Sequence, residues 1–464
     1  MRIIKDQKKA VINRKILIFI LSLTGLFISL HSNTLKAQNE ESLSVLNTRV
    51  ASLQHELQLL EDESDIEILQ KTYGYYVDKN LWEQISELFT DDGTLEIGGR
   101  GIFSGKARVL EYLQWLGEPV HGRLYDHTQL QPVVHVSPDG TTAKGRWRAL
   151  VFGGDYERSS ILGDVIYENE YRKEGEVWKI SKLHAYFIMY TTMDRGWESF
   201  GWANTRPEKD LPPDLPPTVV YDMYPGELTA PEHYPNPVTG GPIFENVDAT
   251  PLKLEYSSAD ELSALLTQLN QRVGLLSDAQ AIENLQNAYG YYFDKRQWDD
   301  AADLFADDGT SEREQYGVYV GKQRVRESFE LYGEAGIAQG NVNNNILYQP
   351  IIHVDEDGLS AKGRLRIFSM LGDYQGDATI SGGVFENEYV KDGGIWKIKS
   401  DHLYTTYIAE YATGWSHGSL PVAGQSEVLP PDLPPTLEYE AFPNYYIVPF
   451  HYDNPVTGEA PVVP

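Results

Sequence analysis

Apolar residues at alternating spacings of four and three open both halves of the chain. They occur at Leu46, Val50, Leu53, Leu57 and Leu60, and again at Leu262, Leu266, Leu269, Val273 and Leu276. This is the spacing of the a and d positions of a coiled coil, so it predicts a heptad helix in each half. Two heptads alone are marginal in water, so each apolar seam must pack on a partner. The pattern leaves two partners open: the seam of the other half, or the domain that follows.

Three shorter helical patterns come next in the first half. Apolar and aromatic residues at helical spacing predict a helix from Asp65 to about Asp78. A helix over 81–89 follows, and Asp91-Asp92-Gly93 is typical of the turn that closes it. A third helix begins after Gly105-Lys106. The first half therefore starts with three helices after its heptad segment.

The period of the apolar pattern then changes to two, which is typical of strands. The alternating segments are 133–136, 143–152, 165–172 and 177–190. Helices followed by a run of strands predict the α+β class. We expect a cone-shaped domain in which a curved antiparallel sheet wraps over three helices and encloses a pocket.

The second half repeats the first. Leu-Pro-Pro-Asp-Leu-Pro-Pro occurs at 211–217 and at 429–435, and Asn-Pro-Val-Thr-Gly occurs at 236–240 and at 454–458. The chain is therefore predicted to hold two tandem cone-shaped domains. The predicted segments are a heptad helix 38–64, a domain 65–198, a proline-rich tail 199–250, a heptad helix 251–280, a domain 281–416 and a proline-rich tail 417–464. Because the tails are repeated nearly intact, we expect them to be ordered against a domain.

The start of the chain has the pattern of an export signal. Residues 1–15 are basic, Ile16 to Leu30 is apolar, and a small-residue site predicts cleavage after Ala37. The alternative is an uncleaved membrane anchor, which needs an apolar run of ~20 residues. The sequence thus predicts a signal peptide over 1–37, a periplasmic or secreted location, and no membrane span after cleavage.

Net charge and cysteine content limit the kinds of partner and metal that the protein could bind. The 464 residues carry a net charge of −29 and no cysteine. Such an acidic protein repels a nucleic-acid backbone, so we expect no nucleic-acid partner. Without cysteine there is neither a disulfide nor a thiolate metal site, and no His-Glu-x-x-His motif occurs. No metal and no cofactor is expected.

Several motifs resemble the SnoaL-like branch of the nuclear transport factor 2-like superfamily, which includes scytalone dehydratase, bile-acid 7-alpha-dehydratase and polyketide cyclases. In the first half they are Tyr73 to Asp78, Leu88 to Gly93, Gly105-Lys106, His127 ahead of Pro132, Tyr167 to Tyr171, and Trp178 to Ile180. The second half repeats them at 289–294, 304–309, 321–322, 382–389 and 396–398. Members commonly pair sheet to sheet, so two fused copies imply an intramolecular pseudo-dimer. A further homo-oligomer stays open.

The resemblance implies three catalytic candidates, Tyr73, Asp78 and His127. Five residues on a helix rotate through about 140°, so the helix must end near Asp78 for that carboxylate to turn inward. Asp78 would then orient the imidazole of His127, which would remove a proton next to a carbonyl while Tyr73 donates to the developing oxyanion. The residues alone also allow a structural interpretation, with a core tyrosine, a helix-end cap and a loop histidine.

The second half departs from this set. It keeps Tyr289 and Asp294, but Asn345 stands where the first half has His127. An amide cannot take a proton near neutral pH, so the two pockets are not chemically equivalent. Another base is offered by His184, which is repeated as His402 on the last long strand.

Further ligand contacts are expected around these candidates. Strand alternation places Tyr186 on the face of His184, and Tyr404 on the face of His402. The remaining binding candidates are Tyr76, Arg146 and Arg148, together with Tyr289, Asp294, Asn345, His402 and Tyr404 of the second half. The arginines could hold an acidic or ketone-bearing ligand, but arginines on a sheet face more often pair with acids or sit at a dimer-like interface.

Together these patterns predict an exported, cofactor-independent lyase or isomerase of the dehydratase or cyclase type. It would act by general acid–base chemistry on a small, largely apolar, oxygenated cyclic compound. The competing prediction is a non-catalytic protein that binds small molecules or assembles through its paired cones. This scaffold hosts enzymes and binding modules alike.

Overall fold

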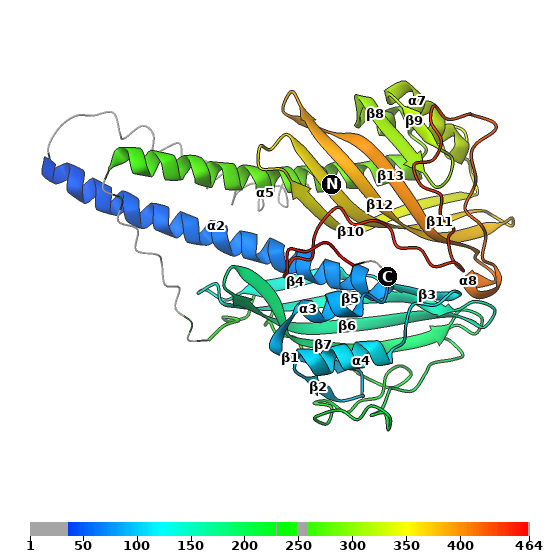
Figure 1. The fold of residues 1–464 in the computed structure, drawn as a ribbon, viewed down its shortest axis with the longest axis horizontal. Helices are drawn as coiled ribbons and strands as arrows, with labels where there is room; N and C mark the ends of the chain where they lie inside the picture. Colours follow the sequence, from blue (N-terminus) through cyan, green and yellow to red (C-terminus); the bar gives the residue numbers. More distant parts are fainter. Residues whose placement is uncertain (1–35, 229, 246, 248–255, 257, 463–464) are drawn as a thin grey trace.

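The computed structural model describes residues 36–228, 230–245, 247, 256 and 258–462. Two long helices cross the molecule, and each leads into one curved sheet (Figure 1). The expected signal peptide lies outside the described residues except for Lys36 and Ala37, which begin the first long helix. None of the helices in the described ranges is long and apolar enough to cross a membrane.

The described residues of the first half form three helices and seven strands. They are α2 (Lys36–Asp78), α3 (Trp82–Glu87), β1 (Phe89–Ile97), β2 (Ile102–Ser104), α4 (Lys106–Trp115), β3 (Arg123–His127), β4 (Leu130–Val136), β5 (Thr142–Asp155), β6 (Ser159–Glu174) and β7 (Val177–Thr192), joined by α8 (Gly414–His417), which packs on β6 from the other half. Gly105 has a φ of 90°, a conformation that favours glycine, and it lets the chain turn into α4.

The second half repeats this order. Its elements are α5 (Ala259–Asp294), α6 (Trp298–Asp303), β8 (Phe305–Arg313), β9 (Val318–Val320), α7 (Lys322–Ser328), the 3-10 turn η1 (Phe329–Tyr332), β10 (Asn341–Val354), β11 (Ser360–Asp373), β12 (Ala378–Asp392) and β13 (Ile395–Glu410). Ser258 caps α5 by accepting a hydrogen bond from the backbone N–H of Glu261. The two tandem α+β domains are therefore present as predicted from the sequence.

Each sheet is mixed rather than antiparallel. The strand orders are β2-β1-β7-β6-β5-β3, with β4 also paired to β5, and β10-β11-β12-β13-β8-β9. Strand β1 runs parallel to β7, and β8 runs parallel to β13. The sequence pattern missed both β1 and β8, because the Asp-Asp-Gly in each copy looks like a turn. In the structure Asp91-Asp92-Gly93 forms an irregularity within β1, between Phe89 and Thr94.

The heptad segment and the helix after it form one continuous helix in each half. Helix α2 runs unbroken from Lys36 to Asp78, so the predicted heptad helix and the first predicted helix of the domain are one helix. The apolar seams of α2 and α5 pack on each other, which settles the open choice of partner. The shared cluster holds Val50, Leu57, Leu262, Leu265, Leu266 and Leu269.

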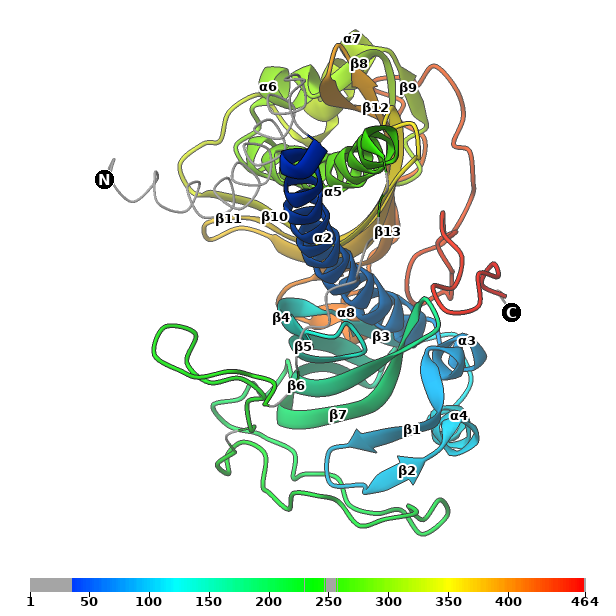
Figure 2. The same ribbon diagram turned by 90° about the vertical axis from the view of Figure 1, so that its left-hand side faces the viewer.

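The two halves also meet through their sheets. Strands β3 to β5 lie against β10 and β11 (Figure 1). The rings of Phe152 and Phe368 stack with centroids 5.0 Å apart. The Tyr75 hydroxyl of α2 donates to the Gln349 carbonyl of β10 at 2.9 Å. Figure 2 shows α2 beginning beside α5 and running down to the sheet of the first half.

The described parts of both proline-rich tails pack against the protein. The first tail covers its own sheet, where the Thr218 N–H donates to Glu96 Oε1 at 2.7 Å and His233 Nδ1 lies 2.9 Å from Glu168 Oε2. The second tail does the same and then crosses to the first half. There the Tyr445 hydroxyl donates to the Lys79 carbonyl at 2.6 Å.

Candidate active site

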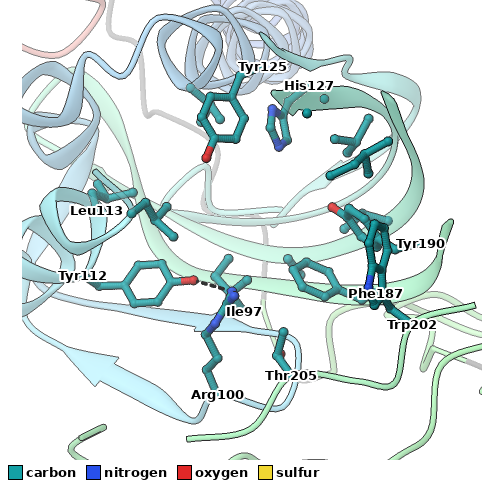
Figure 3. A pocket seen from close by; sticks show the side chains of 18 of the residues that line it. Ile97, Arg100, Tyr112, Leu113, Tyr125, His127, Phe187, Tyr190, Trp202 and Thr205 are labelled. Atoms are coloured by element: carbon teal, nitrogen blue, oxygen red, sulfur yellow. Dashed lines mark hydrogen bonds between the residues drawn. The ribbon is translucent and has the colours of Figure 1, made fainter. Parts of the chain in front are cut away.

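A cavity of about 550 Å³ lies inside the first half (Figure 3). Its walls come from α2, α4, β1, β3, the three long strands β5 to β7, and the first tail, and they are mainly apolar and aromatic. The tail contributes Trp202, Ala203, Thr205 and Met223. A cavity of this size is suited to a small organic ligand.

The short strand β3 brings polar groups into the cavity. Arg123, Tyr125 and His127 alternate along it, and all three line the cavity. The rings of Tyr125 and His127 lie 5.6 Å apart, centroid to centroid. Asp126, between them, points toward the second half and pairs with Arg366.

His127 is held in the neutral form. Burial, with the nearby positive charge of Arg366, lowers the pKa of its imidazole to about 3. Its Nδ1 is buried without a hydrogen-bond partner, 4.0 Å from Asp78 Oδ1. At neutral pH the ring is therefore uncharged.

Asp78 does not orient that ring by a hydrogen bond, which corrects the role expected from the sequence. Its Oδ1 accepts the backbone N–H of His127 at 2.7 Å, and its Oδ2 pairs with the Arg366 guanidinium from the second half. Burial raises the pKa of Asp78, and Arg366 opposes that rise. Asp294 binds the backbone of Asn345 in the same way, at 2.6 Å. Asp78 thus fixes the backbone of strand β3, which carries His127.

Tyr73 lies in the cavity wall as expected. Its ring meets that of Tyr167 at 6.1 Å in an edge-on arrangement. Burial and the neighbouring Tyr167 raise the pKa of Tyr73 well above its usual value, so its hydroxyl stays protonated and can donate a hydrogen bond. Tyr73 and His127 are brought together, and Asp78 lies behind them, outside the cavity lining.

His184 is on the wrong face for the role expected of it. Ala185 and Phe187 of β7 line the cavity, so alternation puts His184 and Tyr186 on the other side of the sheet. There His184 stacks on Tyr186 at 3.8 Å and its Nδ1 lies 3.5 Å from Glu96. Burial lowers the pKa of His184 to about 4.

The equivalent pair of the second half has the same structural arrangement. His402 stacks on Tyr404 at 3.9 Å, and its Nε2 lies 3.7 Å from Glu312. Burial lowers the pKa of His402 to about 4. His402 thus contacts Tyr404 and Glu312, and Tyr404 packs in a cluster with Tyr439 and Val448, so both have structural contacts in place of the expected binding role.

The other binding candidates also serve the structure. Arg146 pairs with Glu168, and Arg148 pairs with Asp164 at 3.1 Å. Tyr76 is fully buried and packs edge-on against Phe450 of the second tail at 5.5 Å. None of these three lines the cavity, so the acid-pairing alternative describes the arginines, and Tyr76 anchors a tail.

The corresponding interior of the second half is filled. Arg313 takes the place of Ile97, and its guanidinium lies 4.1 Å from the centre of the Phe293 ring. It forms an ion pair with Asp401 at 3.3 Å. The Tyr289 hydroxyl donates to the same carboxylate at 3.0 Å. Tyr289 is therefore a buried structural residue, and the Asn345 Oδ1 accepts a hydrogen bond from the Ser369 hydroxyl at 2.8 Å.

Tyr125, Arg100 and Trp202 are among the cavity residues that the sequence analysis missed. Tyr125 was missed because the short strand 123–127 was not predicted, although Tyr125 and His127 are two residues apart, as residues on one face of a strand are. Arg100 lies in a glycine-rich loop that looks like a simple turn, and Trp202 belongs to a tail far along the chain. Within the described ranges no group of three or more His, Asp or Glu side chains could hold a metal ion.

The fold and the cavity define a class of protein: two tandem cone domains of the nuclear transport factor 2-like superfamily, one hollow and one filled. The model of the SnoaL-like domain matches residues 58–184 and 275–402, more than half of the chain. The chain therefore belongs to the SnoaL-like family. No curated protein matches it.

Several solved structures are similar to part of the chain. Hexachlorocyclohexane dehydrochlorinase LinA-type3 from Novosphingobium barchaimii is 24% identical, with a TM-score of 0.27 over 30% of this chain and 93% of that one. An NTF2-like protein from Novosphingobium aromaticivorans is 23% identical, with a TM-score of 0.24 over 28% and 85%. A protein of unknown function from Mycobacterium tuberculosis is 22% identical, with a TM-score of 0.24 over 27% and 70%.

Proposed function

We propose that the first half is a cofactor-independent lyase or isomerase that acts on a small, oxygenated cyclic compound. The observation that carries this proposal is an apolar cavity whose wall holds both a neutral imidazole, His127, and a protonated tyrosine, Tyr73. Family membership supports the same class of chemistry. The basic and apolar start of the chain supports export to the periplasm or beyond.

The proposed step is proton abstraction next to a carbonyl. His127 takes the proton, and the electron pair of the broken C–H bond moves onto the carbonyl oxygen. Tyr73 donates a hydrogen bond to that oxygen. The imidazolium then returns the proton, either to a departing β-hydroxyl, which leaves as water, or to another carbon, which shifts a double bond.

Asp78 supports this step without touching the substrate. It holds the backbone of His127, and its carboxylate lies 4.0 Å from Nδ1, where it favours the imidazolium that forms. Because its other oxygen is bound by Arg366, the second half contributes to the position of the base in the first.

We further propose that the second half is a structural partner in an intramolecular pair. Its interior contains Arg313 and Asp401 in place of Ile97 and Leu183, and it offers Asn345 in place of a base. This filled interior is the observation that favours the competing, non-catalytic function for that half alone.

Exchange of α-protons measured by NMR in D₂O tests the proposal. The probes are cyclic ketones with a β-hydroxyl, such as 3-hydroxycyclohexanone, and the variants are His127→Gln and, as the matched control, Asn345→Ala. General-base loss predicts a fall in exchange of about 100-fold or more for His127→Gln and little change for the control. Unchanged exchange in His127→Gln, or a ligand that raises the melting temperature of the wild type without any exchange, would favour the binding protein.

A further inference from the structure

One cation in the cavity lacks a partner of opposite charge. Arg100 lies in the loop between β1 and β2, and its side chain lines the cavity (Figure 3). Its Nη1 donates to the Tyr112 hydroxyl at 2.9 Å, and its guanidinium lies 5.6 Å from the centre of the Trp115 ring. Its Nε is buried with no hydrogen-bond partner. Arg100 is thus held by aromatic groups, with donors to spare.

No neighbouring carboxylate in the described residues neutralises the guanidinium of Arg100. The other cavity arginine, Arg123, is paired with Asp155 at 3.0 Å, so that carboxylate is already taken. Among the described residues no carboxylate forms an ion pair with Arg100. A guanidinium in an apolar cavity is favoured when an anion joins it, because a charge removed from water costs free energy unless it is paired.

The second half shows how the same fold satisfies an interior guanidinium. Arg313 lies among aromatic rings, as Arg100 does, and Asp401 supplies its counter-charge from the neighbouring strand. The first half has Leu183 where the second has Asp401. The first half therefore has an arginine, Arg100, and an open cavity beside it. The second half has an arginine, Arg313, that is already paired with the carboxylate of Asp401.

We propose that the first cavity binds a cyclic carboxylate, with its carboxylate on Arg100 and its reacting end at His127. Figure 3 shows Arg100 and His127 on opposite sides of the cavity, so one ligand can meet both. A guanidinium fork binds a carboxylate through two parallel hydrogen bonds. The carboxylate on Arg100 stands on the binding geometry alone, and only the assignment of the reacting end rests on the proposed function.

Calorimetric titration with paired probes tests this inference. The probes are cyclohexanecarboxylate, 4-oxocyclohexanecarboxylate and 2-naphthoate, each with the carboxamide of the same shape. The variants are Arg100→Met, Arg100→Lys and, as a control of equal charge change at an exposed position, Lys209→Met. Loss of a charge-assisted contact predicts a Kd about tenfold to hundredfold higher for carboxylates in Arg100→Met. The amides should bind wild type and variant alike.

The outcomes separate this inference from the proposed function. Carboxylates that bind no better than their amides to the wild type, or equally well to Arg100→Met, would overturn it. If Arg100→Met does not fold by circular dichroism, Arg100→Lys decides, with a smaller loss expected because the charge remains and the fork is lost. Carboxylate affinity that depends on Arg100 while α-proton exchange of 4-oxocyclohexanecarboxylate is absent would support this site and reject only the catalytic proposal.

Discussion

Replacing Arg366 with methionine should weaken the contact between the two halves more than any other single charge removal. The Arg366 side chain is 4% exposed and donates to Asp126 Oδ1 at 2.6 Å and to Gln349 Oε1 at 2.9 Å. It also pairs with Asp78, at the end of α2. Without Arg366, the buried carboxylates of Asp78 and Asp126 lose the guanidinium that pairs with both of them.

The magnitude follows from that burial. Removing one partner of a buried ion pair costs about 3–5 kcal/mol, because the remaining charge stays out of water. The duplication supplies the matched control, since Arg148 occupies the same place in the first repeat. Its side chain is 42% exposed and pairs with Asp164. Exposed pairs contribute about 0–1 kcal/mol, so Arg148→Met should change the free energy of unfolding little.

Urea unfolding followed by tryptophan fluorescence and circular dichroism measures both variants. We expect Arg366→Met to lower the unfolding free energy by at least about 3 kcal/mol and Arg148→Met by less than about 1 kcal/mol. Adding Asp126→Asn to Arg366→Met should recover part of the loss, because one unpaired charge is removed. Equal losses in the two single variants would refute the reasoning about burial.

Three further results are expected. Burial holds the pKa of His127 near 3, whereas the pKa of an unfolded histidine is about 6.5. The contribution of neutral His127 to the free energy of unfolding is therefore complete above about pH 6.5 and is lost as the pH falls toward 3. The ring NMR signals of His127 should stay those of neutral imidazole from about pH 8 to pH 5, and a titration midpoint between about pH 6 and 7 would contradict this. Asp401→Leu should lower the free energy of urea unfolding by about 3–5 kcal/mol because it leaves the buried Arg313 without its ion-pair partner. The double variant Asp401→Leu/Arg313→Ile should recover most of that loss, and a double variant as unstable as the single one would contradict this reasoning. Leu269→Ala, in the seam at 1% exposure, should cost about 2–5 kcal/mol, and Leu60→Ala, at 47% exposure, about 0.5 kcal/mol or less in the same assay; equal losses would speak against the seam.

Local patterns in the sequence predicted much of the fold. Alternation predicted the strands β4 to β7, and the heptad spacing predicted the apolar seams of α2 and α5 but left their partner open. Strand β1 was missed because its Asp-Asp-Gly motif has the composition of a turn, while its pairing with β7 is a contact between distant residues. Propensity is local, and such pairing is not.

The site was harder to predict for the same reason. Alternation showed that His184 and Tyr186 share a face of β7, but it could not say which face meets the cavity. Arg148 and Arg366 occupy equivalent positions in the two repeats, although one is exposed and the other lies buried between the halves. Trp202 reaches the cavity only because the tail folds back over the sheet.

The most direct test of the central claim is a crystal structure of the full chain with 4-oxocyclohexanecarboxylate bound. The account predicts one ligand per chain, in the first cavity, with a carbon next to its ketone about 3–3.5 Å from a ring nitrogen of His127 and the interior around Arg313 unchanged. A ligand bound in the second half, or one in the first cavity whose ketone end points away from His127, would contradict it.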